Sequence, residues 1–376
     1  MPDVLRLGFI GGGMDSAVGD THFIASRMDG RFGVEAGCFS NRAEINLQTG
    51  EKWHISTKRC YPDIVPFLEK EKDRLDAVVV LTPTPDHVEP VVTALELGYP
   101  VICEKALATS AADACRIAAV RQEQRGFLAV TYNYSGYPML RELRHWIRQG
   151  RLGLLEQIHI EMPQEGFARL DRHGLPMIPQ PWRLTDGNIP TLSLDLGVHL
   201  HHIIAFLSGE KPMELVALQS SRGRFRKITD NTICIARYSN DLECSLWFSK
   251  AALGYRNGLK VRVFGEQAAA EWRQTDPENL LYYDERGRQF IIDRSDADVE
   301  VACMARYNRF KVGHPAGFIE AFANLYWDIA NAIEASRQNA AHSSEYVYGA
   351  SHAVEGLIML ESMARSSHER GWVTVE

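Results

Sequence analysis

An aspartate, a histidine and a lysine are the side chains best suited to proton transfer and to stabilising charge on oxygen. Asp195 precedes His199 by four residues in a segment with helical periodicity, so both are expected on one helix face. His199 is the natural general base because an unperturbed imidazole titrates near neutrality, and Asp195 can orient the ring. Lys105 follows an apolar run and can hold a substrate oxygen. These three form the predicted catalytic set.

The same residues also have structural interpretations. Asp195 could cap a helix while His199 packs in a core, and Lys105 could be a solvated surface lysine. His201 and His202 fall on other faces of the helix or near its end, and both are interpreted as structural or as metal-free residues at the rim of the site. Because the spacing of these histidines is poor for convergence on one ion, no metal site is expected.

A glycine cluster lies where a first apolar run gives way to a helical pattern. Gly11 and Gly13 occupy the first two positions of the G-x-G-x-x-G/A pattern, and Ser16 supplies a small residue at the third. Gly11 would allow the tight turn, and Gly13 would let the backbone approach a pyrophosphate. The free N–H groups of the following helix would face the phosphates, so the turn predicts a dinucleotide site.

Strand and helix patterns alternate through the first 130 residues. This arrangement predicts parallel strands joined by right-handed helical crossovers. The expected strands are 4–10, 34–39, 77–81, 101–103 and 127–131, separated by helices such as 87–97 and 111–124.

The pattern changes after about residue 135. A helix over 137–149 and a strand over 154–161 lead into a long loop, 162–190, and then a helix over 193–208. Several strands follow with few helices between them, which suggests a largely antiparallel sheet with helices on one face. These strands are 214–219, 232–238, 243–249, 259–264, 269–273 and two more up to 292, and helices follow over 315–333 and 349–365.

The expected fold class is therefore α/β. A Rossmann parallel sheet forms the N-terminal domain, 1–133, and an α+β domain with a large, mostly antiparallel, open-faced sheet forms 134–376. The last helix is free to pack back onto the first domain.

Composition excludes several classes of function. The chain of 376 residues has 41 basic and 48 acidic side chains, a net charge of −7, which argues against nucleic acid as a partner. The basic segment 222–227 is interpreted as a solvated loop. The 7 cysteines are scattered without a Cys-x-x-Cys pair, so free thiols in a reducing cytoplasm are expected. There is no signal-peptide pattern and no apolar run of about 18 residues, so no membrane association is expected.

At this point the sequence resembles the Gfo/Idh/MocA family of oxidoreductases over nearly its whole length, most closely the inositol and aldose dehydrogenases. The resemblance rests on the glycine turn, on Glu104-Lys105 where the family reads Glu-Lys-Pro, and on a D-x-x-x-H motif. A further signature covers residues 82–87, and weaker ones are Trp182-Arg183, 313–315 and 320–324. Ala106 replaces the family's proline, which should loosen the turn that carries Lys105.

The resemblance implies a nicotinamide-dependent dehydrogenase acting on the secondary hydroxyl of a sugar, cyclitol or sugar derivative, with its active site in the cleft between the domains. It also implies a homodimer or homotetramer paired through the open sheet. The residues expected at the cofactor are Gly11, Gly12, Gly13, Met14, Ser40, Asn41, Arg42, Thr82, Pro83, Thr84, His87, Glu104 and Lys105. Those expected at the substrate are Lys105, Tyr132, Trp182, Arg183, Asp195 and His199.

The choice between NAD and NADP depends on the end of the second strand. No carboxylate stands there, and Ser40 and Arg42 could hold the 2′-phosphate of NADP. The related inositol and aldose dehydrogenases commonly use NAD despite a similar strand end. We therefore expect both cofactors to bind, with NAD preferred.

Two other functions are consistent with the same residues. One is a lyase or glycosidase in which transient oxidation by NAD acidifies a neighbouring C–H bond. The other is a non-catalytic dinucleotide sensor, although the joint presence of Lys105, Asp195 and His199 counts against it.

Overall fold

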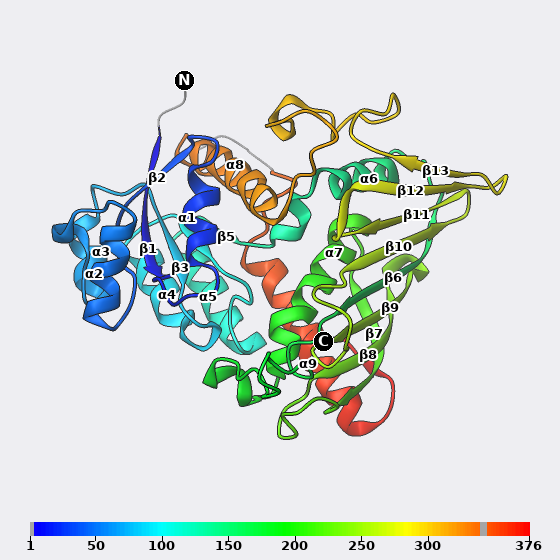
Figure 1. Ribbon diagram of the computed structural model, residues 1–376, viewed down its shortest axis with the longest axis horizontal. Coiled ribbons are helices and arrows are strands. Elements are labelled where there is room, and N and C mark those ends of the chain that lie inside the picture. The colour runs from blue at the N-terminus through cyan, green and yellow to red at the C-terminus, as the bar shows by residue number, and fades with distance from the viewer. Residues whose placement is uncertain (1–3, 339–343) are drawn as a thin grey trace. The chain divides into compact units, whose positions relative to one another are not determined.

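The computed structural model describes residues 4–338 and 344–376, which divide into two compact units (Figure 1). The first unit comprises Met1–Gly136 and Phe318–Glu355, and the second comprises Tyr137–Gly317 and Gly356–Glu376. The first unit thus includes a later segment, beyond the range 1–133 expected from the sequence. No helix in the described part of the chain is long and apolar enough to cross a membrane.

A five-stranded sheet forms the centre of the first unit, and its strands run in the order β2-β1-β3-β4-β5. Every pairing is parallel, which confirms the expected Rossmann-type sheet. The strands are β1 (Leu5–Gly11), β2 (Phe32–Cys38), β3 (Ala77–Leu81), β4 (Val101–Cys103) and β5 (Leu128–Val130). The helices are α1 (Gly19–Arg27), α2 (Ala43–Lys52), α3 (Ile64–Glu71), α4 (Val88–Glu96), α5 (Ala111–Glu123) and α8 (Phe318–Arg337).

Helix α8 completes the core of this unit although it comes almost 200 residues after β5. Its apolar positions recur at helical spacing, and Phe322, Tyr326 and Ile329 join the same buried cluster as Phe9 and Val79 of the sheet. The sheet is therefore covered by the helix that the sequence pattern predicted most clearly.

The second unit contains a nine-stranded sheet, fanned out in Figure 1, in the order β13-β12-β11-β10-β6-β9-β8-β7-β14. Neighbouring strands are antiparallel except for β6 and β9, which pair in parallel at the centre. The mostly antiparallel sheet was expected, whereas its parallel pair was not. The strands are β6 (Leu155–Pro163), β7 (Pro212–Ser220), β8 (Asn231–Tyr238), β9 (Glu243–Ser249), β10 (Lys260–Gly265), β11 (Ala268–Arg273), β12 (Asp276–Asp284), β13 (Gln289–Ile292) and β14 (Val373–Thr374).

Helices cover one face of this sheet. Helix α6 (Pro138–Arg148) contacts β11 and β12, and α7 (Val198–Ser208) contacts β6. Helix α9 (Ala350–Glu369), which belongs to this unit from Gly356 onward, receives a hydrogen bond from the sheet, 2.9 Å between the amide of Ala217 and Oγ of Ser366. The opposite face exposes apolar side chains, including Leu218, Ile233 and Ile235.

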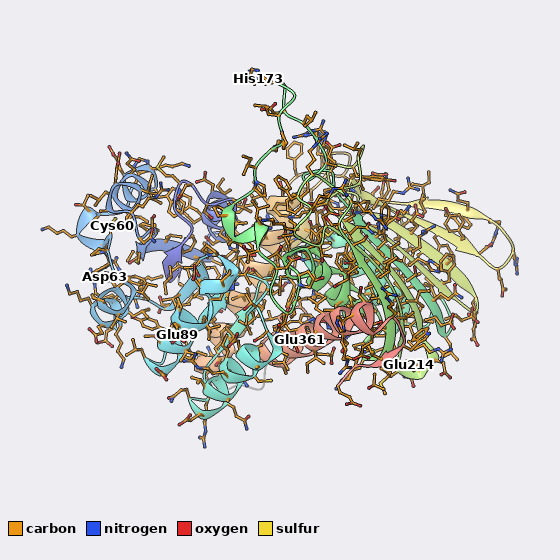
Figure 2. The ribbon with its side chains drawn as sticks, turned by 90° about the horizontal axis from the view of Figure 1, so that it is seen from below. Cys60, Asp63, Glu89, His173, Glu214 and Glu361 are labelled. Atoms are coloured by element: carbon orange, nitrogen blue, oxygen red, sulfur yellow. The ribbon has the colours of Figure 1, made fainter. Side chains whose placement is uncertain are left out.

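A long loop connects β6 to the segment that leads into α7. Its outer part is an ordered turn, in which the carboxylate of Asp171 accepts the amides of His173 and Leu175 at 2.8 and 2.9 Å. Figure 2 shows His173 at the tip of this projecting turn. The inner part of the loop returns to the sheet and carries Trp182 and Arg183 in a short 3₁₀ turn (Pro181–Leu184).

Candidate functional site

The glycine turn after β1 has the backbone that a phosphate-binding turn requires. Gly11 and Gly12 both have positive φ angles, 79° and 77°, which side chains other than glycine rarely adopt. A Cβ on Gly11 would lie 2.7 Å from the amide nitrogen of Thr82, and one on Gly13 would lie 3.0 Å from the carbonyl oxygen of Phe39. The turn is thus a backbone cradle that a Cβ would fill, and it suits a pyrophosphate. The amide of Met14 donates to Oγ1 of Thr49 at 3.1 Å.

Gly19, rather than Ser16, supplies the close packing of helix and strand that the third glycine normally provides. A Cβ on Gly19 would lie 1.9 Å from the carbonyl oxygen of Gly12. Oγ of Ser16 instead accepts the amides of Val18 and Gly19, each at 3.3 Å, just before α1 begins. Helix α1 therefore begins three residues after Ser16.

The end of β2 lies beside the glycine turn. The guanidinium of Arg42 forms an ion pair with the carboxylate of Asp15, and both side chains are largely exposed. Oγ of Ser40 accepts the amide of Arg42 at 3.2 Å, while Asn41 is exposed. A 2′-phosphate would therefore compete with Asp15 for Arg42.

His87 joins the loops that follow β3 and β4. Its ring is 1% exposed, and its two nitrogens lie 2.8 Å from the carbonyl oxygens of Thr82 and Ala106. Burial lowers the pKa of His87 even though both carbonyl oxygens oppose this effect. Pro83 and Thr84 lie at the start of the 3₁₀ turn between these contacts. The imidazole thus fixes the backbone beside Lys105.

A buried network surrounds Glu104. Its Oε1 lies 3.1 Å from Nε2 of His22 and accepts the hydroxyl of Thr131, while Nδ1 of His22 lies 2.8 Å from the hydroxyl of Tyr326. Burial raises the pKa of Glu104, but the hydrogen bond and charge of His22 and the charge of Lys105 outweigh it and hold the pKa below its usual range. The network links α1, the ends of β4 and β5, and α8.

Lys105 follows Glu104 at the end of β4, where ligands of parallel sheets bind. Its side chain is half-buried, and its peptide bond to Ala106 is cis. Tyr132 lies just beyond β5 with its ring edge-on to His352, and burial raises the pKa of its hydroxyl. Both expected residues are therefore at the carboxyl edge of the first sheet.

In the second unit, Asp195 is held by two cations. Nη1 of Arg183 lies 2.6 Å from Oδ2 of Asp195, and Nζ of Lys250 contacts the same oxygen. The guanidinium of Arg183 also stacks over Trp182, 4.4 Å from the ring centroid. Arg183 therefore both stacks on Trp182 and binds Asp195.

Asp195 lies in a π-helical turn (Ser193–Gly197) that runs directly into α7, where His199 is 4% exposed. Such turns are frequent at functional sites. Gly197 lets the turn approach the sheet, since a Cβ there would lie 3.1 Å from the ring of Phe248. His201 and His202 are buried in the same helix.

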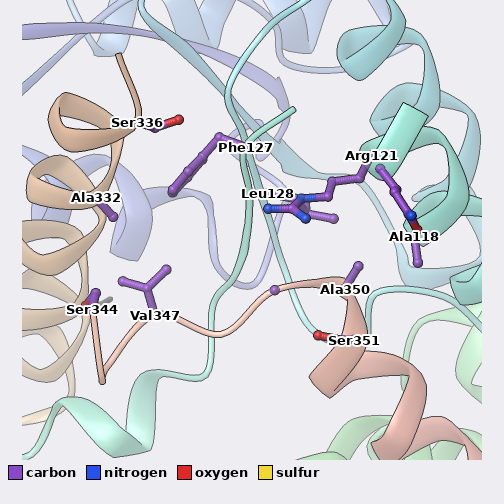
Figure 3. Close-up of a pocket in the computed structure, with 12 residues that line it drawn as sticks. Ala118, Arg121, Phe127, Leu128, Ala332, Ser336, Ser344, Val347, Ala350 and Ser351 are labelled. Carbon is purple, nitrogen blue, oxygen red and sulfur yellow. The ribbon is translucent and has the colours of Figure 1, made fainter. Parts of the chain in front are cut away.

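A separate hollow of about 560 Å³ lies in the first unit (Figure 3). It is lined by α5, α8 and the residues that lead into β5, such as Phe127, with Arg121 at its rim. It therefore lies at the amino end of β5, opposite the glycine turn and Lys105. Since ligands of parallel sheets bind at the carboxyl ends, this hollow is not the candidate site.

Two family models match most of the chain. Residues 5–132 match the oxidoreductase family with an NAD-binding Rossmann fold, and residues 140–271 match the GFO/IDH/MocA C-terminal domain.

Individual relatives agree with these matches. The chain is 30% identical to the uncharacterized oxidoreductase YfiI of Bacillus subtilis, over 99% of this chain and 96% of that protein. It is 28% identical to the NADP-dependent D-xylose 1-dehydrogenase of Haloarcula marismortui, over 38% of each chain. Among solved structures, an inositol dehydrogenase homologue from Azotobacter vinelandii, complexed with NADH and myo-inositol, is 26% identical with a TM-score of 0.90, over 100% of this chain and 98% of that one.

Lys250, Gly19 and His22 were not found from the sequence. Lys250 belongs to no motif and reaches Asp195 because the π-helical turn that carries Asp195 packs on β9, which Lys250 directly follows. Gly19 lies outside the spacing of the glycine pattern, and His22 resembles any helical histidine.

Proposed function

Because the chain belongs to the Gfo/Idh/MocA family of NAD-binding oxidoreductases, we propose that it oxidises a secondary hydroxyl of a sugar, cyclitol or related polyol. The observation that carries this proposal is the ion-paired Asp195 one helical turn before His199, in a chain that also has the glycine turn. The relatives named for inositol and xylose dehydrogenase activity support the substrate class.

The bound nicotinamide supplies the hydride acceptor. His199 takes the proton of the substrate hydroxyl, and Asp195 orients the imidazole and stabilises its protonated form. Lys105 stabilises negative charge as it develops on the substrate oxygen. Trp182, Arg183 and Tyr132 contribute to substrate binding.

The cofactor is held mainly by backbone. Gly11, Gly12 and Gly13 accommodate the pyrophosphate, with the amino end of α1 packed against this turn. We propose that both NAD and NADP bind and that NAD is preferred, because Asp15 already occupies the guanidinium of Arg42.

The exposed sheet face provides the interface of a homodimer or homotetramer. Strand β8 alternates strictly, with Cys234 and Ala236 buried and Ile233 and Ile235 about half exposed on the other face. Leu218 of the neighbouring β7 extends this face. Contiguous apolar surface of this kind marks an interaction site, and a second copy of the chain would cover it.

The activity is tested by incubating the protein with a panel of polyols and sugars, once with NAD and once with NADP. Net formation of reduced cofactor is the expected result. Bond cleavage without net reduction would point to the lyase or glycosidase, and binding without turnover to the sensor.

The variant His199→Asn tests the assignment of the base. We expect hydride transfer to fall by about 10²- to 10⁴-fold, the usual contribution of general base catalysis, with dinucleotide affinity nearly unchanged. His201→Asn is the matched control on the same helix and should retain turnover. Wild-type turnover in His199→Asn would remove His199 from the mechanism.

A further inference from the structure

The parallel pair at the centre of the second sheet brings two chain segments to one edge. Strands β6 and β9 end in register, with Pro163 opposite Ser249. Lys250 comes directly after β9, and the loop that carries Arg183 comes after β6. In an otherwise antiparallel sheet, only such a pair places two consecutive carboxyl ends side by side, which is where parallel sheets bind their ligands.

The backbone of Lys250 is fixed on both sides. Its amide donates to the carbonyl oxygen of Asp230 at 2.8 Å, and its own carbonyl oxygen accepts the amide of Phe167 at 2.8 Å. Its ammonium lies 5.1 Å from the ring centroid of Phe167 and contacts Oδ2 of Asp195. With 8% of the residue exposed, the side chain has little freedom to adopt another orientation.

Arg183, which lies in the loop after β6, contacts the same oxygen, Oδ2 of Asp195. Its amide donates to the carbonyl oxygen of Gln180 at 2.9 Å, and its guanidinium rests on Trp182. Two cations on one oxygen fix the direction of a carboxylate more firmly than a single ion pair does. Holding a lysine and a carboxylate largely out of solvent is costly for stability, which favours a functional explanation.

We propose that Lys250 is a positioning residue of the reaction, which together with Arg183 fixes the carboxylate of Asp195. Lys250 acts through Asp195 and does not contact the substrate. This inference rests on the proposed function, in which Asp195 orients His199.

A double-mutant cycle between positions 250 and 195 tests it, with Lys250→Met, Asp195→Asn and the double variant. We expect Lys250→Met to lower kcat by about 10- to 100-fold, as expected for a small misplacement of a catalytic group, with KM and NAD affinity little changed. Lys250→Arg should recover much of the loss. In the Asp195→Asn background, Lys250→Met should change kcat by less than about threefold.

Lys260→Met is the matched control. Lys260 forms an ion pair with Glu161 at 2.5 Å between β10 and β6 of the same sheet, outside the proposed site, so turnover should remain at the wild-type value. Thermal unfolding of the wild type, the two single variants and the double variant gives a second coupling energy between positions 250 and 195, which does not depend on activity.

The possible results distinguish the positioning role of Lys250 from the proposed role of Asp195. Equal losses in both backgrounds would show that Lys250 acts independently of Asp195 and would overturn the inference, as would wild-type turnover in Lys250→Met. Absence of coupling in the unfolding cycle would overturn it even if no substrate were turned over. Wild-type turnover in Asp195→Asn would instead reject the proposed role of Asp195, and the inference with it.

Discussion

Substituting Gly19 by alanine should weaken cofactor binding without unfolding the protein. The new Cβ would lie 1.9 Å from the carbonyl oxygen of Gly12, whereas ordinary contact begins at 3.4 Å, so α1 and the glycine turn must separate by about 1.5 Å. Both partners are backbone and cannot rotate away. Overpacking of this kind costs up to about 3 kcal/mol, which should lower the Tm by about 6–12 °C.

The displaced helix should also lose part of its interaction with the phosphates of the cofactor. Loss of one hydrogen bond to a charged group, about 1.5–3 kcal/mol, corresponds to a Kd for NAD that is about 10- to 100-fold higher. The assays are calorimetric unfolding and titration of tryptophan fluorescence with NAD. The control is Gly33→Ala in β2, where the nearest atom to a new Cβ is 3.6 Å away. Unchanged Tm and Kd in Gly19→Ala would refute the packing of α1 on the turn.

Three further predictions concern charge and assembly. Asp15→Asn releases Arg42 from an exposed ion pair that is worth at most about 1 kcal/mol. In titrations with each cofactor, NADP should therefore bind up to about fivefold tighter, whereas the affinity for NAD should not change. Burial raises the pKa of Asp76, but hydrogen bonds, mainly from Arg6, outweigh it and lower the pKa to about 2, so this carboxylate stabilises the fold above pH 4. The stability difference between wild type and Asp76→Asn, about 1–2 kcal/mol at neutral pH, should therefore shrink as pH falls below 4 and vanish once pH falls below about 2 in chemical unfolding experiments. Ile235→Arg should yield monomers in sedimentation experiments in which the wild type is oligomeric, and an unchanged assembly would place the interface elsewhere.

The sequence was most informative where a local pattern determines the structure. The alternating strands and helices predicted the parallel sheet, and the apolar positions of α8 predicted that helix, because burial imposes a period on both. The sequence was less informative about which strands pair with one another. The neighbours of β6 depend on contacts across the sheet, so the parallel pairing with β9, and with it Lys250, could not be predicted.

The site shows the same contrast. The glycine turn carries a fixed spacing that follows from turn geometry, whereas the π-helical turn that carries Asp195 was not expected from the helical pattern. Nothing in the local sequence indicates that the carboxylate of Glu104 turns inward to His22, since the two residues meet only in the folded chain. The ion pair between Arg42 and Asp15, which bears on cofactor choice, likewise depends on the approach of two separate loops.

Direct observation of hydride transfer is the sharpest test of the central claim. A polyol that supports turnover would be prepared with deuterium at the carbon that carries the reacting hydroxyl, and the reduced cofactor analysed by mass spectrometry. We expect one deuterium per reduced nicotinamide in the wild type, and labelled cofactor that forms about 10²- to 10⁴-fold more slowly in His199→Asn. Turnover that leaves the deuterium out of the cofactor would contradict it.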